Sequence, residues 1–167
     1  MPNDRPAALD LAEEIVKYLV QEKKMIAAAE SCTAGLVADL IGSVPGASSV
    51  FWGSFVAYTA DAKYRMLGVP GELIEKYGAV SRPIALAMAE GALEKSGAFW
   101  AFSVTGLAGP GGDANSGLPI GTVWIGIAGR DGGPEAVEFR FSGSRDEVRQ
   151  AAAAAALNKL WDRINSY

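Results

Sequence analysis

The segment of residues 25–35 constrains the fold of this chain most, because its pattern changes from strand to turn to helix within a short stretch. It reads Met-Ile-Ala-Ala-Ala-Glu-Ser-Cys-Thr-Ala-Gly. The first half is an apolar run of strand length, the second half is small and polar, and residues 36–41 resume an apolar pattern with helical spacing. We therefore predict a strand over residues 25–29 and then a helix over residues 31–42, which begins at Ser31.

Strand-length and helix-length patterns also alternate along the rest of the chain. Helices are predicted over residues 7–21, 59–67, 72–77, 81–96 and 144–165, and further strands over residues 49–58, 98–105, 121–128 and 136–141. The last two strands flank a glycine-rich turn and are predicted to form an antiparallel hairpin. Because helices precede and separate the strands, they can cover both faces of a central sheet. The pattern predicts a single layered α/β/α domain over residues 1–167 with a mixed, partly parallel sheet, its core at about residues 7–163.

The composition excludes several kinds of site. The 167 residues include no His and one Cys, which excludes a Ser–His–Asp triad, a histidine metal site, an intrachain disulfide and a cysteine-rich zinc site. The net charge is −4 and no basic stripe is present, which argues against nucleic acid or an anionic membrane as the main partner. No apolar run is long enough to span a bilayer, and the N-terminus lacks the apolar core of a signal peptide. We therefore expect a cytoplasmic protein.

Polar clusters follow three of the predicted strands, at residues 30–33, 58–63 and 105–113. Ligands gather at the carboxyl ends of strands in open α/β sheets, so the three clusters can converge on one pocket. The third cluster is rich in glycine, which lets the backbone approach a ligand closely and present N–H groups to an anion. Its spacing matches neither the dinucleotide fingerprint nor a Walker A loop, so a flexible surface loop remains the alternative.

Ser31 has two interpretations. At the predicted start of a helix it either caps that helix or acts as a nucleophile with unpaired backbone N–H groups beside it. Because the chain has no histidine, the candidate bases for a nucleophilic serine are Lys63, Tyr58, Asp61 and Glu30. The pKa of a lysine is lowered in a desolvated, mostly apolar pocket, so such a lysine can accept a proton near neutral pH. A Ser31–Lys63 pair assisted by Tyr58 is therefore sufficient for acyl transfer, although most lysines are solvated.

Two further features leave alternatives open. Cys32 is either a rival nucleophile, activated by the start of the helix, or a small buried apolar residue. The aromatic residues Phe51, Trp52 and Phe55 belong either to the core or to the interface of a homodimer or higher homo-oligomer.

Five motifs that occur in order along the chain resemble the C-terminal domain of competence/damage-inducible protein CinA, the nicotinamide-nucleotide amidase family. They are Ala-Glu-Ser-Cys-Thr-Ala-Gly at residues 29–35, Gly-Ser-Phe-Val-Ala-Tyr at 53–58 with Lys63, Gly-Ala-Val-Ser at 78–81, Thr-Gly-Leu-Ala-Gly-Pro-Gly-Gly at 105–112, and Pro-Ile-Gly-Thr-Val at 119–123. The resemblance covers about residues 7–163. Some relatives carry an additional N-terminal nucleotide-pyrophosphatase-like domain, and the length of this chain predicts a stand-alone form.

The resemblance implies hydrolysis of the carboxamide of nicotinamide mononucleotide to nicotinate mononucleotide and ammonia, in NAD salvage. By this likeness Ser31 is the nucleophile, Lys63 is the base, and Tyr58 and Thr105 assist proton transfer or hold the amide. The implied partner is a small pyridine nucleotide, and no metal or organic cofactor is needed.

The resemblance also implies a set of residues that contact the substrate around these four. They are Glu30, Cys32 and Thr33 beside the nucleophile, Gly106, Gly109, Gly111 and Gly112 in the glycine-rich loop, and Arg145 as a phosphate contact. Two alternatives stay open, namely an amidase for another substrate and a non-catalytic nucleotide-binding or regulatory module. The second alternative rests on Leu118, where the family often has a lysine.

Overall fold

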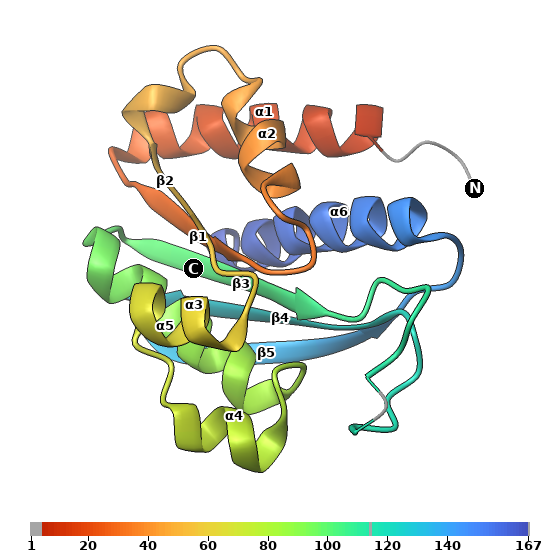
Figure 1. Cartoon of the computed structure of the whole chain (residues 1–167). Helices are drawn as coiled ribbons and strands as arrows, with labels where there is room; N and C mark the ends of the chain where they lie inside the picture. The colour runs from red at the N-terminus through yellow and green to blue at the C-terminus, as the bar shows by residue number, and fades with distance from the viewer. Residues whose placement is uncertain (1–4, 114, 167) are drawn as a thin grey trace.

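A five-stranded mixed sheet forms the centre of the molecule (Figure 1). The computed structural model describes residues 5–113 and 115–166. The strand order is β2-β1-β3-β4-β5. Strand β1 (Ile26–Glu30) is parallel to its neighbours β2 (Phe51–Val56) and β3 (Trp100–Gly106), whereas β4 (Thr122–Gly129) and β5 (Gly132–Arg140) continue the sheet in antiparallel fashion. The predicted α/β class and the predicted hairpin are confirmed.

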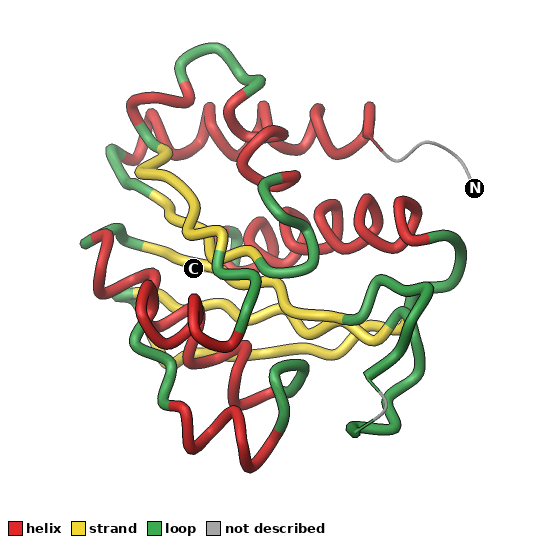
Figure 2. The backbone as a smooth tube through the Cα atoms, in the orientation of Figure 1, coloured by secondary structure: helices red, strands yellow, loops and turns green. Residues whose placement is uncertain are grey.

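Helices cover both faces of the sheet (Figures 1 and 2). One face carries α1 (Arg5–Glu22), α2 (Leu36–Gly42) and α6 (Arg145–Ile164). The opposite side carries α3 (Ala60–Leu67), α4 (Gly71–Tyr77) and α5 (Arg82–Ser96), and a short 3-10 helix (Ala47–Ser49) precedes β2. Across the described ranges, 5–113 and 115–166, no helix combines the length and the apolar character that a membrane crossing requires.

The central strand β1 shows why both faces must be covered. Successive side chains of a strand point to opposite faces. Ile26 and Ala28 belong to the core on the α1 and α6 side, whereas Ala27 and Ala29 belong to the core on the α5 side, and all four are fully buried. A strand that is apolar on both faces is typical of the middle of a parallel sheet.

The structure corrects the predicted start of the helix that follows β1. Residues 31–35 form a turn, and α2 begins only at Leu36. Within this turn Ala34 and Gly35 have positive φ angles of 47° and 99°. Ser31 therefore does not occupy the N-terminus of a helix, and the prediction that it does was wrong.

The carboxylate of Glu30 explains the displaced helix start. It accepts hydrogen bonds from the backbone N–H groups of Val37 (2.8 Å) and Ala38 (3.3 Å), and from the Ser54 hydroxyl (2.8 Å). The last residue of β1 therefore satisfies the first N–H groups of α2 from outside the helix. The preference of Ser for the N-cap concerns neighbouring residues and does not predict this contact. The turn of residues 31–35 places the start of α2 next to the carboxylate of Glu30.

The other two predicted caps have different outcomes. Ser144 and Glu147 form the predicted capping box at the start of α6. Ser81 occupies the N-cap position of α5, but its hydroxyl donates to the carbonyl of Gly78 (2.9 Å) and makes no capping bond.

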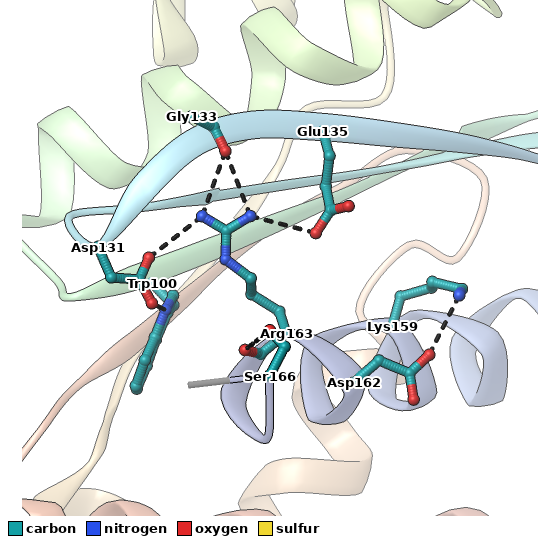
Figure 3. A network of polar contacts seen from close by, with 8 residues as sticks. All are labelled: Trp100, Asp131, Gly133, Glu135, Lys159, Asp162, Arg163 and Ser166. Atoms are coloured by element: carbon teal, nitrogen blue, oxygen red, sulfur yellow. Dashed lines mark hydrogen bonds and ion pairs between the residues drawn. The ribbon is translucent and has the colours of Figure 1, made fainter.

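A buried arginine joins the end of α6 to the β4–β5 turn (Figure 3). The guanidinium of Arg163, which is 8% exposed, donates to Asp131, Glu135 and the carbonyl of Gly133, each at 3.2 Å. Asp131 also accepts a 2.8 Å hydrogen bond from the indole N–H of Trp100. The network therefore ties the last helix to the edge of the sheet that lies away from Ser31.

We expect Arg163→Met to lower the free energy of unfolding by about 3 kcal/mol, because the largely buried carboxylate of Asp131 loses its charged partner and keeps only the indole N–H of Trp100 among the contacts of the described residues. Urea unfolding monitored by circular dichroism measures the change. Lys159→Met is the matched control, since its ion pair with Asp162 (3.1 Å) is on the surface of the same helix and should contribute less than about 1 kcal/mol. Equal changes in the two variants would contradict a stabilising role for the network.

Candidate active site

The carboxyl ends of the three parallel strands bring together the residues that the sequence singled out (Figure 1). Ser31 directly follows β1, Tyr58 follows β2, and Thr105 lies near the end of β3. Lys63 lies on α3, one turn after the N-cap Thr59. Because β1 lies between β2 and β3, all of these residues meet at one edge of the sheet.

Ser31 and Lys63 are in direct contact. The ammonium nitrogen Nζ of Lys63 lies 2.8 Å from Oγ of Ser31, and the lysine side chain is 1% exposed. Lys63 also donates to the carbonyl oxygens of Ala57 (3.1 Å) and Tyr58 (3.3 Å). When Lys63 is neutral, two N–H groups can serve these carbonyls, which leaves its lone pair free to accept the proton of Ser31.

Burial makes Lys63 a base near neutral pH. Desolvation lowers the pKa of Lys63 from 10.5 to about 8, because the buried site disfavours the charged ammonium form. About a tenth of the molecules at pH 7, and about half at pH 8, then hold a neutral amine against the serine hydroxyl. This arrangement is that of an activated nucleophile with its general base.

The turn after Ser31 offers backbone donors for an oxyanion. The N–H of Ser31 itself is used, because it donates to the carbonyl of Val104 (2.9 Å). Within the described ranges, the N–H groups of Cys32 and Thr33 have no acceptor. Of these two residues only Cys32 lines the hollow, so the N–H of Cys32, rather than the first turn of α2, is the candidate oxyanion donor.

Cys32 is not an activated thiol. It is buried, and desolvation raises its pKa to about 11 from its usual 9.0, so the thiol is protonated at neutral pH. Of the two neighbouring candidates for the nucleophile, the structure favours Ser31, since only Ser31 has a base in hydrogen-bonding contact.

The pair opens into a hollow of about 230 Å³. It is lined by Ser31, Cys32, Tyr58, Lys63, Ala79, Val80, Thr105, Gly106, Leu107, Ala108, Gly109, Gly111 and Arg145. The segment at Ala79 and Val80 is held in place by Thr105, whose hydroxyl donates to the carbonyl of Ala79 (2.8 Å). Ala79 and Val80 belong to a quoted motif but had no predicted role, whereas Leu107 and Ala108 belong to the glycine-rich loop that was expected to contact the substrate.

Arg145 and Tyr58 lie at the mouth of this hollow. The guanidinium of Arg145 donates to the phenolic oxygen of Tyr58 (2.8 Å) and to the carbonyl of Gly109 (2.6 Å). It thereby connects the end of β2, the glycine-rich loop and the first residue of α6. Tyr58 is 50% exposed, so the mouth is open to a ligand from solvent.

Four residues from the sequence analysis lie outside the hollow. Glu30 is fully buried and its carboxylate holds α2, so it is neither a base for Ser31 nor a substrate ligand. Thr33 is fully buried beneath the turn, and Gly112 does not reach the lining. Asp61 is exposed and pairs with Arg65 (2.9 Å), which rules it out as the base.

A larger hollow of about 670 Å³ lies on the other side of Ala79 and Val80, which line both. Its lining combines Lys76, Arg82 and Arg140 with Glu75, Asp113 and Glu138. These opposite charges favour no one kind of ligand, and neither Ser31 nor Lys63 lines this space. We therefore place the chemistry in the smaller hollow.

The aromatic residues of β2 divide between core and surface. Phe51 packs against the core on the α1 side, whereas Trp52 is 46% exposed and stacks on Phe55, with 5.1 Å between the ring centroids.

Comparison with known proteins places this geometry in a family. The family model described as "CinA C-terminal domain" matches residues 8–164. The chain belongs to the CinA C-terminal domain family. Its five quoted motifs thus fall in one CinA domain, and three of them supply Ser31, Lys63 and Thr105.

Relatives and solved structures of CinA proteins agree with this assignment. A CinA-like protein of Anaeromyxobacter is 48% identical over 151 residues, which is 90% of this chain and 36% of that protein. A competence/damage inducible protein from Agrobacterium tumefaciens has a solved structure that is 41% identical, with a TM-score of 0.89 and coverage of 93% of this chain and 94% of that one. A competence damage-inducible protein A from Klebsiella pneumoniae is 29% identical with a TM-score of 0.91, covering 96% and 98% of the two chains.

The chain spans 36% to 38% of the length of the first curated relatives that it matches. The similarity therefore concerns the CinA domain of those proteins.

Proposed function

We propose that this CinA domain hydrolyses the carboxamide of nicotinamide mononucleotide to nicotinate mononucleotide and ammonia. The observation that carries the proposal is the 2.8 Å contact between Oγ of Ser31 and a buried Lys63 whose pKa is lowered to about 8. The family resemblance supplies the substrate, and the geometry supplies a nucleophile and base suited to an amide.

In the first half of the reaction, the neutral amine of Lys63 takes the proton of Ser31 as Oγ attacks the carboxamide carbon. The carbonyl oxygen becomes an oxyanion, which the free N–H of Cys32 can stabilise. When the tetrahedral intermediate collapses, Lys63 returns the proton to the departing nitrogen. The C–N bond breaks, ammonia leaves, and the acyl group remains on Ser31 as an ester.

In the second half, a water molecule replaces ammonia next to Lys63. Lys63 takes a proton from this water, the resulting oxygen attacks the ester carbon, and the bond to Oγ breaks. Lys63 then returns the proton to Ser31. The net change is one amide and one water converted to one carboxylic acid and one ammonia.

The size of the hollow supports a substrate that enters only in part. At about 230 Å³ it is smaller than the roughly 300–1,000 Å³ of sites that enclose a whole drug-sized ligand. We place the pyridine carboxamide inside, against Ser31, and the ribose and phosphate at the mouth. Arg145 and the loop of residues 106–111 lie there, and a guanidinium with backbone groups of glycine suits a phosphate.

The pH dependence of the rate should report the neutral fraction of Lys63. Because the pKa of Lys63 is about 8 and the base must be unprotonated, we expect kcat/KM to rise about tenfold per pH unit below 8 and to level off above it. Initial rates from pH 6 to 10 measure this profile. A profile that is flat from pH 6 to 9 would contradict Lys63 as the base.

The substrate assignment is tested with the wild-type protein and three amides. Ammonia and carboxylic acid should form one to one from nicotinamide mononucleotide, more slowly from the phosphate-free nucleoside, and slowest from free nicotinamide. Equal rates on all three would contradict the assignment of the phosphate to the mouth. Binding of the nucleotide, measured by calorimetry, without any ammonia would instead support a non-catalytic binding module.

A further inference from the structure

Arg149 on α6 reaches the turn that carries the nucleophile. Its Nε donates to the carbonyl oxygen of Cys32 (2.9 Å) and its Nη2 donates to the carbonyl oxygen of Thr33 (3.1 Å). Nη1 also pairs with the exposed Asp146 at 3.5 Å. One guanidinium thus binds two consecutive peptide groups directly after Ser31, and such charge-assisted bonds are among the stronger hydrogen bonds in proteins.

The peptide group between Cys32 and Thr33 depends on Arg149 more than its neighbours do. The carbonyl of Ser31 accepts from the N–H of Ala34 (3.0 Å), and the carbonyl of Thr33 accepts from the N–H of Leu36 (3.1 Å) as well as from Arg149. In the part of the chain that the structure describes, the bond from Arg149 is the one hydrogen bond that the Cys32–Thr33 peptide group makes.

Other features show that the turn needs an external support. The hydroxyl of Thr33 is buried without a hydrogen-bond partner, so this side chain does not anchor the turn through its polar atom. Ala34, with a φ angle of 47°, and Gly35, at 99°, follow in left-handed conformations, and this region costs a non-glycine residue about 1 kcal/mol or more. A peptide group in such a turn can rotate unless another element holds it.

We propose that Arg149 is a positioning residue for the acyl-transfer reaction. It fixes the Cys32–Thr33 peptide group through the carbonyl of Cys32, and thereby orients Cys32, the residue that directly follows the nucleophile. In the described ranges the N–H of Cys32 has no acceptor in another residue, and Cys32 lines the hollow beside Ser31. Arg149 therefore sets both the alignment of Ser31 with Lys63 and the direction of an oxyanion donor, without touching the substrate.

This inference rests on the proposed amidase activity, and its test begins with Arg149→Met. Loss of one oxyanion donor or misalignment by about 1 Å each lowers turnover about 10²-fold or more. We expect kcat on nicotinamide mononucleotide to fall about 10²- to 10³-fold, with KM changed less than about threefold, because the mouth of the hollow is intact. The pH profile should keep its inflection near 8, since the surroundings of Lys63 are unchanged.

Three controls separate positioning from general destabilisation. Asp146→Asn removes the ion pair but keeps both carbonyl contacts and should retain wild-type kcat. Arg65→Met removes an exposed arginine of α3 and should also retain it. Arg149→Ala should regain activity with a few tens of millimolar guanidinium but not with sodium at the same ionic strength.

The result that would overturn the proposal is a kcat of Arg149→Met within threefold of the wild type in folded protein. If Arg149→Met fails to fold, Arg149→Lys serves instead, since a freely rotating ammonium lacks the planar guanidinium fork that holds the two carbonyls in a fixed geometry, and a wild-type kcat in this variant would equally overturn it. If wild-type protein itself releases no ammonia, the proposed function fails. Hydrogen–deuterium exchange of the backbone amides then tests whether Arg149 holds the turn. Faster exchange of residues 32–34 in Arg149→Met supports the positioning role, and unchanged exchange contradicts it.

Discussion

Ser31→Ala should lower ammonia release from nicotinamide mononucleotide by about 10⁴-fold or more. In the proposed reaction the serine supplies the atom that bonds to the substrate carbon, and loss of the nucleophile in enzymes of such a mechanism removes nearly all turnover. The fold should survive, because among the described residues Oγ forms hydrogen bonds only with Nζ of Lys63 and, at 3.4 Å, with the carbonyl of Tyr58. An enzyme-coupled ammonia assay under single-turnover and multiple-turnover conditions measures the loss.

Ser49→Ala is the matched control for this variant. Ser49 is exposed and its hydroxyl bonds only to the carbonyl of Gly46 (2.8 Å), so the rate should stay within about twofold of the wild type. If Ser31→Ala kept a tenth of the wild-type rate while it bound the nucleotide normally, Ser31 would not be the nucleophile.

Lys63→Met should lower kcat by about 10³- to 10⁴-fold, at the upper end of what general acid–base catalysis contributes. In the proposed mechanism Lys63 acts twice, as the base toward Ser31 and as the acid toward the leaving nitrogen. Methionine has a similar length and suits a site that is 1% exposed, and the desolvation penalty of the charged lysine disappears with it. We therefore expect loss of turnover without loss of the folded state, which circular dichroism and thermal unfolding would check.

Lys63→Arg tests whether Lys63 supports turnover by transferring a proton or by its positive charge. A guanidinium stays protonated, so it keeps a positive charge beside Ser31 but cannot act as a base. Turnover should be as low as in Lys63→Met. An active Lys63→Arg would mean that Lys63 serves only to attract or orient the substrate. Lys95→Met, an exposed lysine in the last turn of α5, should leave turnover unchanged.

The sequence was sufficient to predict the elements because their signals are local. The apolar run of β1, the capping box at Ser144 and the glycine-rich turn of the β4–β5 hairpin each depend on residues close in the chain. The start of α2 could not be predicted in this way. It depends on the carboxylate of Glu30, which returns to the helix across a turn of positive φ angles.

The candidate site was predictable in its centre and less so at its edges. Ser31 follows β1, Lys63 lies on the helix after β2, and Thr105 lies near the end of β3. These strands are neighbours in the sheet, so the convergence of the three residues follows from the topology. Arg149 lies 117 residues after Cys32, and no pattern in the sequence joins them. Its contact with the turn arises only when α6 packs against the sheet.

The measurement that tests the central claim most directly is ammonia release from nicotinamide mononucleotide at pH 9, where Lys63 is mostly neutral, by wild type, Ser31→Ala and Lys63→Met in one assay. We expect wild type alone to release ammonia, with nicotinate mononucleotide in equal amount. Ammonia from the Ser31→Ala protein at the wild-type rate would contradict a Ser–Lys amidase. Nucleotide binding without ammonia from the wild type would leave the hollow as a binding site and contradict the hydrolytic function.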